Sequence, residues 1–133
     1  MTEADMIRRT KRFALRVLKL IDVLPDSCAG RVIAAQLGRC ATSVGANYRA
    51  ACRGRSKAEF YSKLGIVEEE ADESLYWLEL IMEAELIKPA RIRPLYLEAE
   101  EILAIIVASR RTTAQSLAAE RANRKSQIAN RKS

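Results

Sequence analysis

The chain has 133 residues, of which 49% are hydrophobic and 30% charged, and its formal net charge is +6. A chain of this length is expected to form one domain whose core needs neither disulfides nor a metal. Five glycines and three prolines are few, and the abundance of Ala, Leu, Glu, Arg and Ile favours helices. No segment approaches the roughly 20 apolar residues of a membrane span, and residues 1–5 are too acidic for a signal peptide. We therefore expect a soluble, cytoplasmic protein.

The first predicted helix covers residues 3–24. Pro25 ends it, because the residue before a proline is disfavoured in the helical conformation. One helical stripe with 4-3 spacing contains Met6, Thr10, Phe13, Val17, Leu20 and Leu24. The remaining positions are rich in cations, with a row formed by Arg8, Arg12, Arg16 and Lys19 and flanked by Arg9 and Lys11.

The second predicted helix follows residues 25–27, where Asp26 or Ser27 can cap its first turn. Its main stripe contains Ile33, Leu37, Cys40, Val44, Asn47 and Ala51. A second row consists of small residues, namely Ala34, Gly38, Ala41, Gly45 and Cys52. Glycine costs roughly 1 kcal/mol relative to alanine inside a helix. Two glycines in this row therefore predict that a neighbouring helix approaches closely.

The third predicted helix begins at a capping box, Ser56 to Glu59, and extends to about Glu85. Its stripe contains Phe60, Leu64, Val67, Ala71, Ser74, Leu78 and Ile81. The helix also carries an acidic run made of Glu68, Glu69, Glu70, Asp72 and Glu73. Pro89 is expected to break the chain after this helix.

The fourth predicted helix starts near Pro94 and ends between Ala119 and Arg121. Its stripe contains Leu95, Ala99, Ile102, Ile106, Ser109 and Thr113, and the apolar run 102–107 predicts burial on two sides. Residues 122–133 are basic, contain Ala-Asn-Arg-Lys-Ser twice and are nearly devoid of apolar side chains, so we predict disorder there. The chain is thus divided into a helical domain, 1–121, and a basic tail, 122–133.

Four amphipathic helices with short connections predict an all-α, up-down-up-down antiparallel four-helix bundle. Charge is strongly partitioned along it. Residues 1–57 carry a net charge of +8, residues 58–101 carry −8, and residues 102–133 carry +6. Complementary faces favour head-to-tail contacts, which close into a ring if the rotation permits. We therefore expect a homo-oligomer.

No catalytic constellation is recognisable, so we expect a non-enzymatic protein without cofactor or metal. The absence of histidine excludes Ser–His and Cys–His nucleophiles and the Glu-x-x-His motifs of bundle di-metal sites. There is no glycine-rich phosphate loop. The cysteines at positions 28, 40 and 52 are twelve residues apart, which is unlike a metal knuckle, and we interpret them as small buried residues with reduced thiols.

The cations favour nucleic-acid binding, because phosphate contacts need long basic side chains at intervals along a surface. The predicted contacts are Arg8, Arg9, Arg12, Arg16 and Lys19 on the first helix, and Arg49, Arg53, Arg55 and Lys57 around the turn after the second. Antiparallel topology places this turn beside the start of the first helix. Few aromatic residues are present, so we expect recognition of RNA or DNA by charge and shape. The alternative is a protein-interaction scaffold or accessory subunit whose charged faces serve self-assembly and partner docking only.

Several segments resemble the S23, or 23S rRNA intervening-sequence protein, family. They are residues 9–15 (RTKRFAL), 24–25 (LP), 36–48 (QLGRCATSVGANY), 69–74 (EEADES) and 77–80 (WLEL). The resemblance covers about residues 7–110 and implies a four-helix bundle that assembles into a homopentameric ring. It also implies a relation to accessory variability proteins, which bind nucleic acid and a reverse transcriptase through a basic surface. No catalytic residues come with the resemblance, and Ala50 stands where many relatives carry glutamate.

Overall fold

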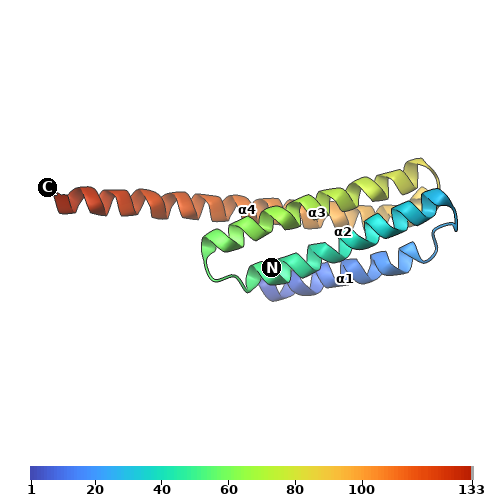
Figure 1. Ribbon diagram of the computed structural model, residues 1–133, viewed down its shortest axis with the longest axis horizontal. Coiled ribbons are helices and arrows are strands. Elements are labelled where there is room, and N and C mark those ends of the chain that lie inside the picture. The colour runs from blue at the N-terminus through green and yellow to red at the C-terminus, as the bar shows by residue number, and fades with distance from the viewer. Residues whose placement is uncertain (133) are drawn as a thin grey trace.

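A computed structural model describes residues 1–132, most of which belong to four helices. They are α1 (Glu3–Ile21), α2 (Cys28–Cys52), α3 (Lys57–Glu83) and α4 (Pro89–Lys132). No β-strand occurs within these 132 residues, so the all-α, four-helix prediction is confirmed. The helices lie side by side, and the chain reverses its direction at each of the three short connections (Figure 1).

Side-chain caps start the first three helices. The Thr2 hydroxyl accepts a hydrogen bond from the Asp5 amide (3.1 Å), and the Asp5 carboxylate accepts one from the Thr2 amide (3.0 Å), which completes a capping box that sequence reasoning missed. Ser27, not Asp26, caps α2, and Ser56 caps α3. The reciprocal bond predicted for the Ser56 box is displaced by one residue, since the carboxylate of Glu59 accepts from the amide of Arg55.

Helix α4 differs from the prediction at both ends. It begins at Pro89, whose missing N–H is not needed in a first turn. Pro94 lies inside the helix and removes a single backbone bond near its exposed start. At the other end the helix continues through Lys132, so the predicted disorder of residues 122–133 is corrected for 122–132, and Ser133 lies outside the described residues. The segment contains no glycine or proline, and its terminal cations favour the helix dipole.

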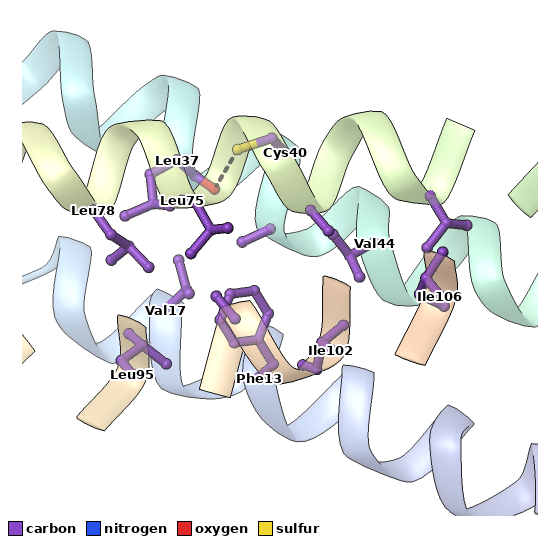
Figure 2. Packing of buried hydrophobic residues seen from close by; sticks show 14 of the residues in the cluster. Phe13, Val17, Leu37, Cys40, Val44, Leu75, Leu78, Leu95, Ile102 and Ile106 are labelled. Atoms are coloured by element: carbon purple, nitrogen blue, oxygen red, sulfur yellow. Dashed lines mark hydrogen bonds between the residues drawn. The ribbon is translucent and has the colours of Figure 1, made fainter. Parts of the chain in front are cut away.

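The predicted stripes meet in one hydrophobic core. Buried side chains from all four helices, including Phe13, Val17, Leu37, Leu78 and Ile102, point toward a shared interior (Figure 2). Several details differ from the prediction, among them Leu20, Leu24, Phe60 and Ser109, which are only half-buried. On α2 Tyr48 is buried and Asn47 only half-buried, and in the segment 102–107 only the two isoleucines at 102 and 106 are buried, so this segment is covered on one side.

The small-residue row of α2 faces α1, as its glycines predict. A Cβ atom on Gly45 would lie 3.4 Å from the backbone of Thr10, and one on Gly38 would lie 3.1 Å from the Ile21 side chain. The buried Thr10 hydroxyl donates to the Met6 carbonyl oxygen (2.9 Å). Close contact therefore joins α1 to α2, whereas α1 packs much less extensively against α4.

None of the helices described over residues 1–132 combines the length and the apolar character needed to cross a membrane.

Candidate nucleic-acid interface

A row of arginines lines a groove along α1. The groove has a volume of about 610 Å³ and is lined by Arg8, Arg9, Arg12, Arg16 and Glu98. The buried stripe of α1 includes Phe13 and Val17, and it leaves Arg12 and Arg16 exposed on another side of the helix. Neither arginine forms an ion pair within the described chain. These two guanidinium groups are therefore available to an anion.

Arg9 has a different role, because its guanidinium is engaged within the protein. It donates two hydrogen bonds to the carboxylate of Glu98, from Nε (2.9 Å) and Nη2 (2.7 Å), and Nη2 lies 3.1 Å from the carboxylate of Glu101. The hydrogen bonds to Glu98 raise the pKa of Arg9 above its already high ordinary value. The pairing joins α1 to α4 and removes Arg9 from the free cations on which our prediction depended.

Lys57 is also engaged, at the start of α3. Its ammonium group donates to the Ser116 hydroxyl (2.7 Å) and to the Glu120 carboxylate (2.5 Å), both on α4. The hydrogen bond from Lys57 lowers the pKa of Glu120. Lys57 therefore connects α3 to α4.

Arg8 pairs with Asp5 at 2.5 Å, but both side chains are largely exposed, and such a pair contributes little to stability and exchanges easily.

The cations around the α2–α3 turn divide into two groups. Arg53 and Arg55 are exposed in the turn itself. Arg49 lies instead in a groove of about 190 Å³ between α1 and α2, together with Lys11 and small residues of α2. Lys19 is exposed in the last turn of α1, far along the helix from this end.

As predicted, the α2–α3 turn and the start of α1 lie at the same end of the bundle. A cavity of about 470 Å³ at this end of the bundle is lined by residues from the start of α1, by Tyr48 near the end of α2, by Phe60 near the start of α3 and by residues 105–113 of α4. No ion pair or side-chain hydrogen bond in the described range links Arg53 or Arg55 to α1. The turn and the start of α1 therefore share an end of the molecule, and within residues 1–132 no polar interaction joins these two arginines to α1.

Most of the acidic run on α3 is paired. Arg39 of α2 binds Glu70 (3.3 Å) and Glu73, and Arg110 of α4 binds Glu68 (3.6 Å). Glu69 and Asp72 are exposed and form no ion pair within residues 1–132. The negative charge that remains free on α3 is thus concentrated on the side away from the core.

Cys40, Glu70 and Glu73 bring three potential metal ligands within 4.8 Å of one another. Arg39 already forms ion pairs with both carboxylates. Burial raises the pKa of the Cys40 thiol to about 11, so the thiolate that a metal requires is scarce near neutral pH. The Ser74 hydroxyl donates to the Cys40 sulfur (3.3 Å). This donor set is better suited to packing than to a divalent cation.

The prediction that the cysteines are buried is wrong for Cys28, which is exposed.

Two features of the surface were missed by sequence reasoning. The guanidinium of Arg110 lies 4.5 Å from the centre of the Tyr61 ring, which removes one aromatic face from solvent. The second feature is the helix formed by residues 121–132, which were interpreted as disordered. Ala-Asn-Arg-Lys-Ser repeats there after seven residues, which is close to two helical turns, and this spacing is typical of a helix with its cations on one side.

Comparisons with known proteins identify the family. The model of the 23S rRNA-intervening sequence protein family matches residues 2–108. No curated protein matches the chain. Among solved structures, a protein with unknown function from the S23 ribosomal protein family of Bacteroides thetaiotaomicron is 31% identical, with a TM-score of 0.77 and coverage of 84% of this chain and 99% of that chain. The chain therefore belongs to the 23S rRNA-intervening sequence protein family.

Proposed function

We propose that this protein is a non-enzymatic helical bundle that assembles with copies of itself and binds RNA or DNA through its basic surface, mainly by charge and shape. The observation that carries the proposal is the exposed arginine pair of α1. Arg9 is consumed by an internal ion pair, whereas Arg12 and Arg16 beside it remain free in the same groove.

The spacing of these cations suits a polyanion. Arg12 and Arg16 are four residues apart, which is roughly 6 Å along a helix. Duplex DNA carries one negative charge per roughly 1.7 Å of its axis, so neighbouring phosphates can reach both side chains. Arg8 extends the row, since its exposed pair with Asp5 can be replaced by a phosphate. Arg53 and Arg55 add charge at the end of the bundle.

The aromatic residues support recognition by charge more than by base stacking. Tyr48 is buried, Tyr61 is covered by Arg110, and Trp77 is half-buried. Tyr76 is exposed, but it lies on α3 beside acidic residues that repel phosphate. Strands bound by stacking need exposed aromatic platforms within a basic groove. The basic surface of α1 offers cations without such a platform.

Self-assembly is supported by two outward faces of opposite charge. On α1, Leu15 and Leu18 are 54% and 42% exposed, and they share a side of the helix with Lys11, four and seven residues before them, whereas Arg16 lies on another side. On α3, Tyr76 is 54% exposed beside Glu69 and Asp72. Helices α1 and α3 do not pack on each other, so these faces lie at opposite corners of the bundle. Such a pair of faces favours a heterologous contact that closes into a ring, and the family resemblance implies a ring of five.

The test is fluorescence anisotropy with labelled RNA over a salt series. The quantity measured is the salt slope, the steepness with which the logarithm of the binding constant falls against the logarithm of the salt concentration. The double variant Arg12→Gln/Arg16→Gln should reduce this slope by about 1.4 on a single strand, at roughly 0.7 per phosphate contact. The matched control is Arg31→Gln/Arg91→Gln, which removes the same charge from exposed positions at the starts of α2 and α4 and should leave the slope unchanged. Equal effects of both variants would overturn the assignment to α1.

The proposed assembly is tested separately by multi-angle light scattering at micromolar concentration. A mass of about five chains is expected, and a monomer would overturn the ring. If the protein assembles but binds neither RNA nor DNA at low salt, the scaffold function replaces the nucleic-acid function.

A further inference from the structure

Helix α4 continues well beyond the bundle (Figure 1). Where it leaves the bundle, its residues Ser116 and Glu120 bind Lys57 at the start of α3. Residues 121–132 then extend into solvent, and every one of them is exposed. At 1.5 Å per residue this free part, here called the arm, is roughly 17 Å long. The arm also lies beyond the family match, which ends at residue 108.

The sequence of the arm places its cations on one side. Ala-Asn-Arg-Lys-Ser starts at residue 122 and again at residue 129, and seven residues are close to two helical turns. With 3.6 residues per turn, all charged positions of the arm fall within an arc of about 120°. This face consists of Arg121, Arg124, Lys125, Arg131 and Lys132, with Ile128 between them. The opposite side carries uncharged residues such as Ala122, Asn123 and Ser126.

This arrangement is unfavourable for an isolated helix. Arg121 lies three residues before Arg124 and four before Lys125, and like charges at these spacings repel each other. No acidic residue occurs within residues 121–132, and the nearest one, Glu120, is bound by Lys57. The arm buries no side chain to offset this repulsion. An external polyanion that lies along the face would remove the repulsion and supply the missing counter-charges.

We infer that the arm is a second nucleic-acid contact, whose cationic face binds the phosphodiester backbone next to the bundle. This inference rests on the proposed function and adds a site to it. Two repeats set equivalent cations roughly 10.5 Å apart along the helix, so the face can contact phosphates on both sides of a groove or successive phosphates of a strand. A protein partner is less well matched, because Ile128, 53% exposed, is the sole large apolar side chain described between residues 121 and 132.

The experiment uses the full chain with labelled duplex DNA, duplex RNA and single-stranded RNA over a salt series. In a neutralised variant, Arg124, Lys125, Arg131 and Lys132 are each replaced by glutamine. The salt slope should then fall by up to about 3.6 on duplex DNA, at roughly 0.9 per contact. The three probes distinguish a duplex backbone from a single strand.

A composition-matched variant tests the one-sided face directly. Asn123→Arg/Arg124→Asn with Lys125→Ser/Ser126→Lys keeps the net charge and the residue content, but moves two cations to the uncharged side. The slope on duplex DNA should fall by about 1.8, at roughly 0.9 per contact. An unchanged slope would overturn the claim that the face matters.

The outcomes separate the arm from the bundle. If the wild type binds and the neutralised arm leaves the slope unchanged, the inference fails while the proposed function stands. If the arm variants lose binding and Arg12→Gln/Arg16→Gln does not, the arm stands and the α1 site fails. If the wild type binds no nucleic acid, both fail. If neutralisation lowers the mass of the assembly without nucleic acid, the arm binds a second copy of the chain and the inference is overturned.

Discussion

The ion pair between Arg9 and Glu98 should contribute far more to stability than an ordinary surface pair. Both side chains are 20% exposed, and the carboxylate accepts two hydrogen bonds from one guanidinium. Exposed pairs contribute about 0–1 kcal/mol, whereas breaking a buried pair costs about 3–5 kcal/mol. For this intermediate burial we expect Glu98→Ala to lower the free energy of unfolding by about 2 kcal/mol. At roughly 2.1 cal/mol/K per residue, the midpoint temperature should fall by about 7 °C.

Glu101 provides the matched control. Its carboxylate lies 3.1 Å from the same Nη2 atom of Arg9, but its side chain is 64% exposed. Glu101→Ala should therefore change the free energy of unfolding by less than about 0.5 kcal/mol. Urea denaturation at fixed protein concentration measures both variants, and adding Arg9→Met completes a double-mutant cycle with Glu98→Ala. Equal effects of Glu98→Ala and Glu101→Ala would refute the argument from burial and bidentate geometry.

Further experiments test other parts of the structure. Gly30→Ala should lower the free energy of unfolding by more than about 2 kcal/mol, because the added Cβ would lie 2.0 Å from a loop carbonyl oxygen. Gly38→Ala is the control and should be tolerated, because its Cβ would meet only a movable isoleucine side chain at 3.1 Å, and thermal melts compare the two variants. Ser56→Ala removes the cap of α3 and should lower the free energy of unfolding by about 1 kcal/mol in urea titrations. Iodoacetamide at pH 8, followed by mass spectrometry, should modify the exposed Cys28 and spare the buried Cys40, and modification of Cys40 without unfolding would contradict its burial.

The raised pKa of Cys40 also makes the free energy of unfolding depend on pH. Its thiol titrates at about 11 in the folded protein and at about 9 when unperturbed. The unfolded chain therefore releases this proton first, so the contribution to stability is complete below pH 9 and is lost as the pH rises toward 11. Two units correspond to about 2–3 kcal/mol. Cys40→Ala should flatten the decline in the free energy of unfolding between these pH values, and an identical decline in the variant would contradict the assignment.

Helical periodicity made the core predictable, because a stripe depends only on the spacing of residues within one helix. The positions of Phe13 and Val17 followed directly. Asn47 was misplaced because a fixed 4-3 spacing drifts relative to 3.6 residues per turn, and Tyr48 lies closer to the centre of the buried face. The end of α4 was misplaced because a polar segment without a packing partner resembles a disordered one in composition.

The candidate site was less predictable, because ion pairing depends on which helices are neighbours. Arg9 and Arg12 are equivalent in composition, yet Arg9 faces Glu98 on α4 while Arg12 faces solvent. Eighty-nine residues separate the two partners of that pair, so no local pattern could identify it. The same holds for Lys57 and Glu120, which are 63 residues apart. A sequence supplies the cations of a surface, and the fold decides which of them stay free.

The contact of Lys57 with Ser116 and Glu120 lies where α4 leaves the bundle. It joins the root of the arm to the first turn of α3, and because α4 is one continuous helix, the arm keeps the direction that α4 has in the bundle. In a closed ring every copy would hold its arm at the same angle, and a nucleic acid bound by one arm would meet the next as an intramolecular event. Such linkage raises overall affinity by roughly 10²–10⁴ without any new contact. Arms that each bind nucleic acid weakly would then give tight overall binding, because the ring presents several of them at once.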